Sequence, residues 1–148
     1  MATRIEVTND MFDVTELNEW LSLDPQDGAI VTFMGKVRTL ESETLSLYLE
    51  HYQGMTEQVL WRITEQARAR WSLNHIVIIH RIGEILANQA IVFVGVSGPH
   101  RKAAFAAAEF MMDILKSEAP FWKREKTQQG DAWVEAKQSD QAALKKWF

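Results

Sequence analysis

One long amphipathic helix that runs into a cationic strand is the feature that most constrains the fold of this chain. The stretch from Ser97 to Lys126 reads SGPHRKAAFAAAEFMMDILKSEAPFWKREK. Ser97 is predicted to cap the helix and Pro99 to occupy its first turn, where a hydroxyl accepts from free N–H groups and the missing N–H of proline costs nothing. Pro120 is predicted to end the helix, because the residue before a proline avoids the helical region. The following FWKREK then indicates a strand.

The apolar residues of this helix recur at three- and four-residue spacing, which produces one broad apolar face. They are Ala103, Ala104, Ala107, Phe110, Met111, Ile114 and Leu115. The helix is therefore expected to be a core element. Its cations gather at the helix start, in the last turn and just beyond the break: His100, Arg101, Lys102, Lys116, Lys123, Arg124 and Lys126.

The rest of the chain interleaves strands with helices. Strands are predicted at 3–7, 28–38, 45–52, 75–85, 90–96, 121–127 and 132–137. Further helices are predicted from Asp13 to about 23, from Thr56 to about 71 and from Ser139 to about 146. Several neighbouring strands have short links and must pair antiparallel, so the sequence predicts an α+β fold with mixed, largely antiparallel sheets and three to four helices. Because 148 residues is the size of one ordinary domain, residues 1–148 are expected to form a single one.

Charge and cysteine content narrow the function. The formal net charge is −4, which argues against a general nucleic-acid or anionic-membrane binder. Positive charge is nevertheless concentrated between His100 and Lys126, where six Lys or Arg residues face four Asp or Glu residues. There is no cysteine, which excludes disulfides, thiolate nucleophiles and Cys-based metal sites. Any sulfur chemistry would therefore need sulfur brought in by a partner. No signal peptide or membrane span is predicted, and the expected location is the cytoplasm.

Two lysines near the end of the long helix are the main candidates for chemistry. Taken alone, Lys116 is most simply a cation that complements the helix dipole, and Lys123 is a strand lysine whose stem covers apolar surface. A helix end followed by a short return strand brings both amines to one concave spot, where mutual repulsion and partial burial favour a neutral amine. An ammonium group becomes a usable base at neutral pH in this way.

Other residues indicate an anion site. His100 and Arg101 sit at a helix start, where the dipole favours anions, so they either bind an anionic ligand or are simply exposed. Arg38 lies where a strand gives way to the polar TLESET segment, a usual place for a ligand contact. The histidines at 51, 75 and 80 have no metal-ligand spacing and are interpreted as structural. Trp20, Trp61 and Trp71 are expected in the core, and core packing is also favoured over ligand stacking for Trp122 and Trp133.

Six motifs in this order and spacing resemble one enzyme family over nearly the whole chain. They are GAIVTFMGKVR, LEHYQGMTE, IHRIGEI, VFVGVSGPHRKAAF, KSEAPFWKRE and WVEA. The family is that of the large, catalytic subunits of molybdopterin synthase. The resemblance implies an α/β hammerhead-type fold and a homodimer at the centre of a heterotetramer, with a small ubiquitin-like partner at each end. The partner's C-terminal Gly-Gly thiocarboxylate would donate sulfur to cyclic pyranopterin monophosphate, and two transfers would make the dithiolene of molybdopterin.

The resemblance also implies roles for individual residues. Lys116 and Lys123 match the catalytic lysines of the family. Arg38, His100 and Arg101 match substrate-anion contacts, and pocket-lining positions are matched by Phe33, Met112 and Glu125. Gly98-Pro99 departs from the small or hydroxylated residues expected before His100, and Lys137 stands where relatives carry arginine. No cofactor or metal of the chain's own is predicted.

Two alternatives remain open at this point. The chain is either this sulfurtransferase or a non-catalytic module that grips an acidic protein tail in its basic concavity. Within the enzyme reading, Arg101 and Lys116 would be roughly 22 Å apart along one continuous helix. One small substrate cannot touch both, so each active site is predicted to combine Lys116, Lys123 and Arg38 of one subunit with His100 and Arg101 of the other.

Overall fold

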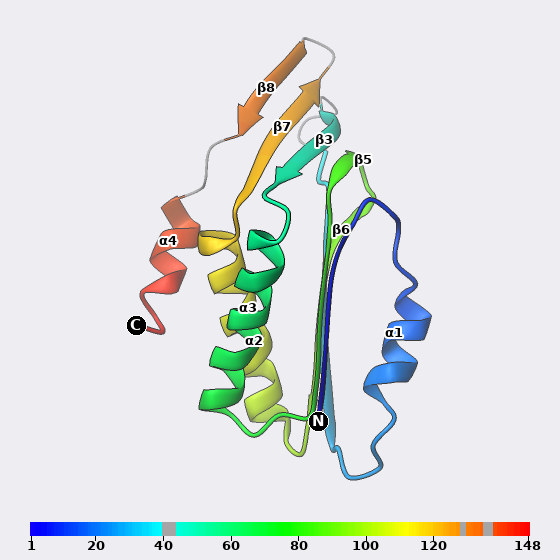
Figure 1. The fold of residues 1–148 in the computed structure, drawn as a ribbon, viewed down its shortest axis with the longest axis vertical. Coiled ribbons are helices and arrows are strands. Elements are labelled where there is room, and N and C mark those ends of the chain that lie inside the picture. The colour runs from blue at the N-terminus through cyan, green and yellow to red at the C-terminus, as the bar shows by residue number, and fades with distance from the viewer. Residues whose placement is uncertain (40–43, 128–129, 135–137) are drawn as a thin grey trace.

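Two four-stranded sheets form the framework of the computed structural model, which describes residues 1–39, 44–127, 130–134 and 138–148 (Figure 1). The main sheet has the order β1-β4-β6-β2, with β1 (Ala2–Thr8) parallel to β4 (His75–Arg81), and with β6 (Ala90–Gly98) antiparallel to both β4 and β2 (Ala29–Lys36). The second sheet is antiparallel throughout, with the order β5 (Gly83–Leu86), β3 (Thr44–His51), β7 (Phe121–Thr127) and β8 (Gly130–Val134). The prediction of largely antiparallel, mixed sheets is confirmed.

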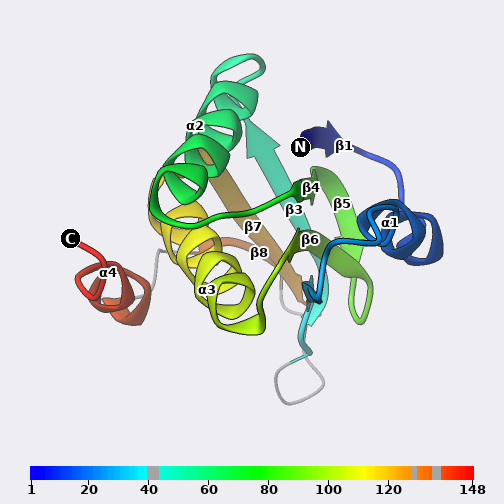
Figure 2. The ribbon, with the colours of Figure 1, turned by 90° about the horizontal axis from the view of Figure 1, so that it is seen from below.

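Four helices lie within the described residues, as the α+β prediction required. They are α1 (Val14–Leu21), α2 (Met55–Arg70), α3 (Arg101–Glu118) and α4 (Gln138–Leu144). Figure 2 shows α2 and α3 on one face of the main sheet and α1 on the other, while α4 lies outside α3. Successive side chains of β4 point to opposite faces of the main sheet. Ile76 and Ile78 join the core beneath α2 and α3, and Val77 and Ile79 join the smaller core beneath α1. Within the described residues, no helix combines the length and apolar character needed to cross a membrane.

The apolar face predicted for the long helix is the centre of the main core. Six of its seven members are buried, from Ala104 to Leu115, and only Ala103 is partly exposed. α3 ends at Glu118, and its C-cap residue Ala119 is extended, as expected before Pro120. Asp13 caps α1 as predicted, because its carboxylate accepts from the backbone N–H groups of Thr15 and Glu16.

The predicted helix starts at Ser97 and Thr56 were wrong. Ser97 belongs to β6, where pairing with β2 continues to Gly98, and its Oγ accepts from the backbone N–H of His75 at 2.9 Å. The N-cap residue of α3 is His100, which makes no capping hydrogen bond with its side chain. Thr56 lies inside α2 and its hydroxyl donates to the Tyr52 carbonyl at 2.9 Å, because the helix already begins after Gly54. In both cases the hydroxyl makes a hydrogen bond with a backbone group of an earlier residue instead of capping the helix.

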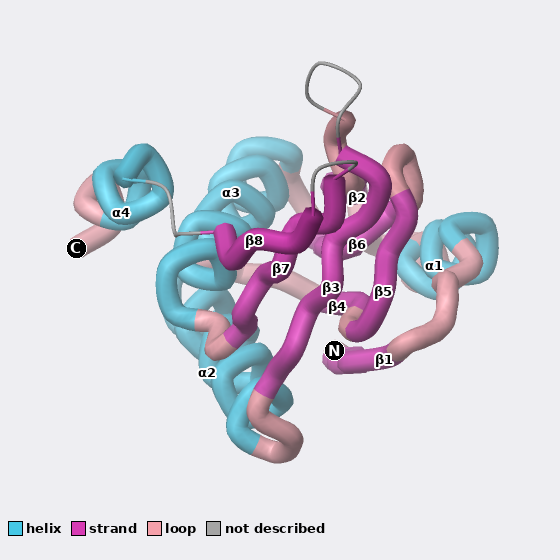
Figure 3. Tube along the Cα trace, turned by 90° about the horizontal axis from the view of Figure 1, so that it is seen from above, coloured by secondary structure: helices cyan, strands magenta, loops and turns pink. Residues whose placement is uncertain are grey.

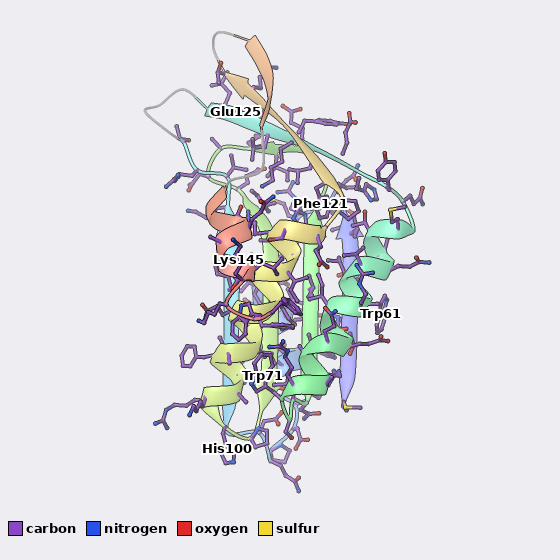
Figure 4. The ribbon with its side chains drawn as sticks, turned by 90° about the vertical axis from the view of Figure 1, so that its left-hand side faces the viewer. Trp61, Trp71, His100, Phe121, Glu125 and Lys145 are labelled. Carbon is purple, nitrogen blue, oxygen red and sulfur yellow. The ribbon has the colours of Figure 1, made fainter. Side chains whose placement is uncertain are left out.

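Three further details of the prediction need correction. The single strand expected over 75–85 is two strands, because Gly83 has φ 79° and sends β5 into the second sheet, which crosses the end of the main sheet (Figure 3). Ser139 is inside α4 rather than its cap, and this helix ends at Leu144. Trp61 is not a core residue: it is 46% exposed and projects outward from α2, whereas Trp71 packs against the main core (Figure 4).

Candidate functional site

A cleft of about 820 Å³ lies between the end of β2 and the C-terminal end of α3. Phe33 of β2, Arg38 just beyond that strand and Lys116 in the last turn of α3 all line it. Three residues singled out from the sequence, separated by up to 83 positions, therefore meet in one place. The cleft offers one aromatic ring and three exposed cations, Lys36, Arg38 and Lys116, a combination that suits an anion carried on a ring system.

The backbone next to Arg38 is held firmly although its side chain is exposed. The N–H of Val37 donates to the Gln89 carbonyl at 2.9 Å, and the N–H of Asn88 donates back to the Val37 carbonyl at 2.8 Å. The turn that supplies these groups is itself braced by buried Arg81, whose Nη1 donates to the Ala90 carbonyl at 3.1 Å. Arg38 thus extends from a fixed point into the cleft, and residues 40–43 lie outside the described residues.

Two cleft residues were missed by the sequence reasoning. Nζ of Lys36 donates to Oδ1 of Asn88 at 2.6 Å, and both side chains line the cleft with Lys116. Asn88 has φ 70°, a left-handed conformation that asparagine tolerates in turns. Two signals could have pointed to them: Lys36 stands two positions before Arg38, and Asn88 lies in the short ANQ turn between two strands. Nothing in the sequence, however, connects these two positions.

Lys123 lies half-buried on β7, opposite Leu49 of β3. Strand alternation places Phe121, Lys123 and Glu125 on one face of β7, and Phe121 packs against the small core that contains Leu49. Lys123 therefore projects from the inner face of the second sheet, toward its junction with the main sheet.

His80 is a buried ring that feels the charge of both lysines. Burial is the main cause that lowers its pKa to about 3; a hydrogen bond to the Arg81 carbonyl opposes this shift, and the charges of Lys123 and Lys116 contribute to it. Lys116 at the end of α3 and Lys123 on β7 therefore both act on this buried ring. Of the two, Lys116 lines the cleft.

Two other predicted site residues lie beside this region. Met112, one turn before Lys116, is half-buried against the main core and is not among the described residues that line the cleft. Glu125 is half-buried on β7, two positions beyond Lys123. Lys137 lies outside the described residues. Among the residues that are described, no group of three or more His, Asp or Glu side chains is placed to hold a metal ion.

His100 and Arg101 are not part of this cleft. They line a separate pocket of about 720 Å³ at the start of α3, together with Gly28, Lys102 and Phe105. Figure 4 shows His100 at one end of the molecule and Phe121 with Glu125 at the other. Within one chain, the predicted anion contacts thus divide between two pockets at opposite ends of α3.

Curated proteins of one name match this chain over nearly its whole length. Residues 7–118 match the family model described as MoaE protein. The chain is 52% identical over 147 residues to a molybdopterin synthase catalytic subunit of Escherichia coli (strain K12), covering 98% of each chain. It is 50% identical over 146 residues to the protein of the same name from Pasteurella multocida (strain Pm70), covering 97% of each.

Solved structures give the same result. The molybdopterin biosynthesis MoaE protein of Burkholderia ambifaria matches with a TM-score of 0.85 and 42% identity, over 99% of this chain and 98% of that one. Molybdopterin synthase of Staphylococcus aureus matches with a TM-score of 0.81 and 30% identity, over 88% and 96%. A chain from a Helicobacter pylori complex of subunits 1 and 2 of molybdopterin-converting factor shares the fold, with a TM-score of 0.73 at 20% identity over 90% of each chain.

Proposed function

This chain belongs to the MoaE family of molybdopterin synthase catalytic subunits, sulfurtransferases of molybdenum cofactor biosynthesis, and we propose how its residues carry out the transfer. The sulfur comes from the C-terminal thiocarboxylate of a small ubiquitin-like partner and passes to cyclic pyranopterin monophosphate. The observation that carries this assignment is the cleft in which Arg38, Phe33 and Lys116 meet. It combines cations for a phosphate or a thiocarboxylate with an aromatic ring for a pterin.

Within this cleft the two lysines do the chemistry. Lys116 is an exposed amine at the cleft wall and acts on the reacting atoms of the substrate. The charge of Lys123, like that of Lys116, acts on the buried ring of His80. Lys123 stabilises the thiocarboxylate and the charge that develops on it, because a fixed cation in a partly desolvated site stabilises a growing negative charge. Arg38 binds the substrate anion and Phe33 forms part of the wall, while Met112 and Glu125 lie beside the cleft.

The sulfur donor enters as the tail of a second protein. The Helicobacter pylori relative was solved as a complex of two subunits, which supports a small partner for this chain as well. Because this sequence has no cysteine, sulfur must be delivered from outside. A Gly-Gly tail has no side chains, so its terminal group can approach the cations of the cleft closely.

A homodimer completes each site. β2 is an edge strand of the main sheet and runs beside α3 in the same direction, so the His100 pocket lies at one end of this pair and the Lys116 cleft at the other. Large apolar side chains are exposed along it: Ile30, Phe33 and Met34 on β2, and Phe105 on α3. A second copy laid antiparallel on this edge covers these side chains and brings its His100 and Arg101 to the Lys116 cleft. Each site then has a full set of cations.

The whole chain, residues 1–148, acts as one catalytic domain in the cytoplasm. The matched region stops at Glu118, but the residues after α4 contact α3 through their side chains. Nε1 of Trp147 donates to Asp113 at 2.7 Å, and Nζ of Lys146 donates to Glu109 at 2.9 Å. The C-terminal segment therefore supports the helix that presents Lys116.

The deciding experiment is a product assay with purified components. The chain, the thiocarboxylated partner and cyclic pyranopterin monophosphate are expected to yield the dithiolene product, detected by mass spectrometry. The matched control is the same mixture with a partner that ends in an ordinary carboxylate, which binds but carries no sulfur. Tail binding without product in the complete mixture would identify the chain as a non-catalytic tail-binding module.

A further inference from the structure

The ring of His80 lies against the ring of Phe121 at the junction of the two sheets. Their centroids are 4.0 Å apart and the ring planes differ by 21°, which is a stacked contact. His80 is 4% exposed and comes from β4 of the main sheet, whereas Phe121 is the first residue of β7 in the second sheet. This contact helps to join the two sheets, together with the small core that contains Leu49, Ile85 and Ile91.

The hydrogen bonding of His80 defines its protonation. Nδ1 is 2.8 Å from the backbone carbonyl of Arg81, which only accepts, so Nδ1 carries the proton. Burial, together with the charges of Lys123, Lys116 and His51, holds the pKa of His80 at about 3, so the ring is neutral at physiological pH. His80 therefore provides a flat, uncharged surface next to two cations.

Phe121 occupies the corner between the two proposed catalytic lysines. α3 carries Lys116 and ends at Glu118, the chain turns through Ala119 and Pro120, and Lys123 follows two positions after Phe121. Phe121 is paired with His51 of β3 on one side and stacked on His80 on the other. Phe121 begins β7, so a displacement of the start of this strand moves Lys123 relative to Lys116.

We propose that His80 is a positioning residue for sulfur transfer, whose stacked ring fixes Phe121 and thereby the spacing of Lys116 and Lys123. It does not touch the substrate. The role rests on the proposed function of the two lysines, but the placement of the β7 corner is a property of the fold and is measured separately. The stacked surface, more than the Nδ1 hydrogen bond, is the property that the lysines need.

A set of variants separates these properties. His80→Phe keeps a flat ring and loses the Nδ1 donor, His80→Gln keeps an amide donor and loses the ring, and His80→Ala loses both. His75→Ala is the matched control, because His75 lies on the same strand and packs edge-on against Trp20, 4.7 Å between centroids, away from the lysines. The readouts are single-turnover sulfur transfer at saturating partner, partner affinity, and hydrogen exchange of the amides from Phe121 to Lys123.

Because small misplacements of reacting groups are costly, we expect transfer to fall about 10- to 100-fold in His80→Ala and His80→Gln and to stay within about threefold of wild type in His80→Phe and His75→Ala. Partner affinity is expected to change little in all four, and the β7 amides to exchange about tenfold faster only in His80→Ala and His80→Gln. Equal transfer in His80→Gln and His80→Phe overturns the proposal. That comparison still holds if His80→Ala does not fold. If the wild-type chain itself shows no sulfur transfer, the proposed function is refuted instead. In that case hydrogen exchange alone tests the positioning role, and β7 amides that exchange at the wild-type rate in His80→Gln overturn it.

Discussion

Arg101 and Lys116 lie at opposite ends of one continuous helix, α3, and line two different pockets. At 1.5 Å per residue they are roughly 22 Å apart along the axis, more than a small substrate spans. This separation supports the proposal that each site is shared between two subunits. A two-fold axis across β2 and α3 would bring the start of one α3 helix to the end of the other.

Complementation between two inactive chains tests the shared site. A His100→Ala/Arg101→Ala chain and a Lys116→Ala chain, each inactive as a homodimer, are unfolded together in equal amounts and refolded. In a mixed dimer one site collects all the damage and the other is intact, so with random pairing about half the dimers are mixed and about a quarter of wild-type activity returns. Absence of recovery, with mixed dimers confirmed by native mass spectrometry, places all these residues in one subunit or outside the site.

The β2 edge is expected to be the surface between the two copies. Ile30 is 43% exposed on this strand and does not line the lysine cleft, so Ile30→Asp places an unpaired charge in an apolar interface without touching the proposed catalytic groups. The dimer dissociation constant measured by sedimentation is expected to rise at least about tenfold, and activity to fall with the dimer fraction. Leu23→Asp, at an exposed leucine after α1, is the control and leaves the dimer intact. An undiminished dimer in Ile30→Asp argues for a different interface.

Removing either lysine amine is expected to impair catalysis and spare the fold. Lys116 is exposed in the last turn of α3, where its interaction with the helix dipole contributes at most about 1 kcal/mol to the free energy of unfolding. Lys116→Ala is therefore expected to unfold at nearly the wild-type urea concentration while product formation is lost, and Lys123→Ala to slow single-turnover transfer. Lys145→Ala, at an exposed lysine near the C-terminus, is expected to be fully active. Wild-type turnover in Lys116→Ala would reduce this lysine to a structural cation.

The partner's tail is expected to supply the chemistry and only part of the affinity. Truncating its last two residues is expected to abolish sulfur transfer but leave measurable binding, because the body of the partner contacts other surface. Binding of the intact partner is expected to weaken as salt rises from 50 to about 500 mM, since charged contacts at a cationic cleft are screened. Calorimetry at several salt concentrations measures both effects. A truncated partner that still supports turnover rules out insertion of the tail.

Burial of neutral His80 is expected to make the fold acid-sensitive. The pKa of His80 is about 3 in the folded chain, against about 6.5 for an unfolded histidine. Between these values the unfolded chain binds more protons, so the free energy of unfolding falls as pH drops from 6.5 toward 3, by about 2 kcal/mol from pH 7 to pH 5 for this group. Urea denaturation of wild type and His80→Phe at both pH values measures the difference. The variant, which has no titrating ring, is expected to lose that part of the dependence, and an identical loss of stability in both chains would contradict it.

Local sequence chemistry was sufficient for most of the secondary structure. The spacing of apolar residues along α3, the Asp13 cap and the stop at Pro120 each reflect interactions between residues a few positions apart, which are visible in one dimension. The same holds for the division of cations between the two ends of α3. The motifs around Lys116 and Lys123 also indicated the family, and the comparisons confirmed it.

Long-range pairing decided the rest. Ser97 reads as a cap from its neighbours, but pairing between β6 and β2 holds it in the sheet, and Gly83 moves the end of a predicted strand into another sheet. The contact between His80 and Phe121 and the hydrogen bond between Lys36 and Asn88 join residues 41 and 52 positions apart, for which no local pattern exists. Local patterns in the sequence therefore indicated most of the elements and the candidate side chains for the chemistry. Burial and strand register, which depend on contacts between distant residues, set which of those side chains share a cleft.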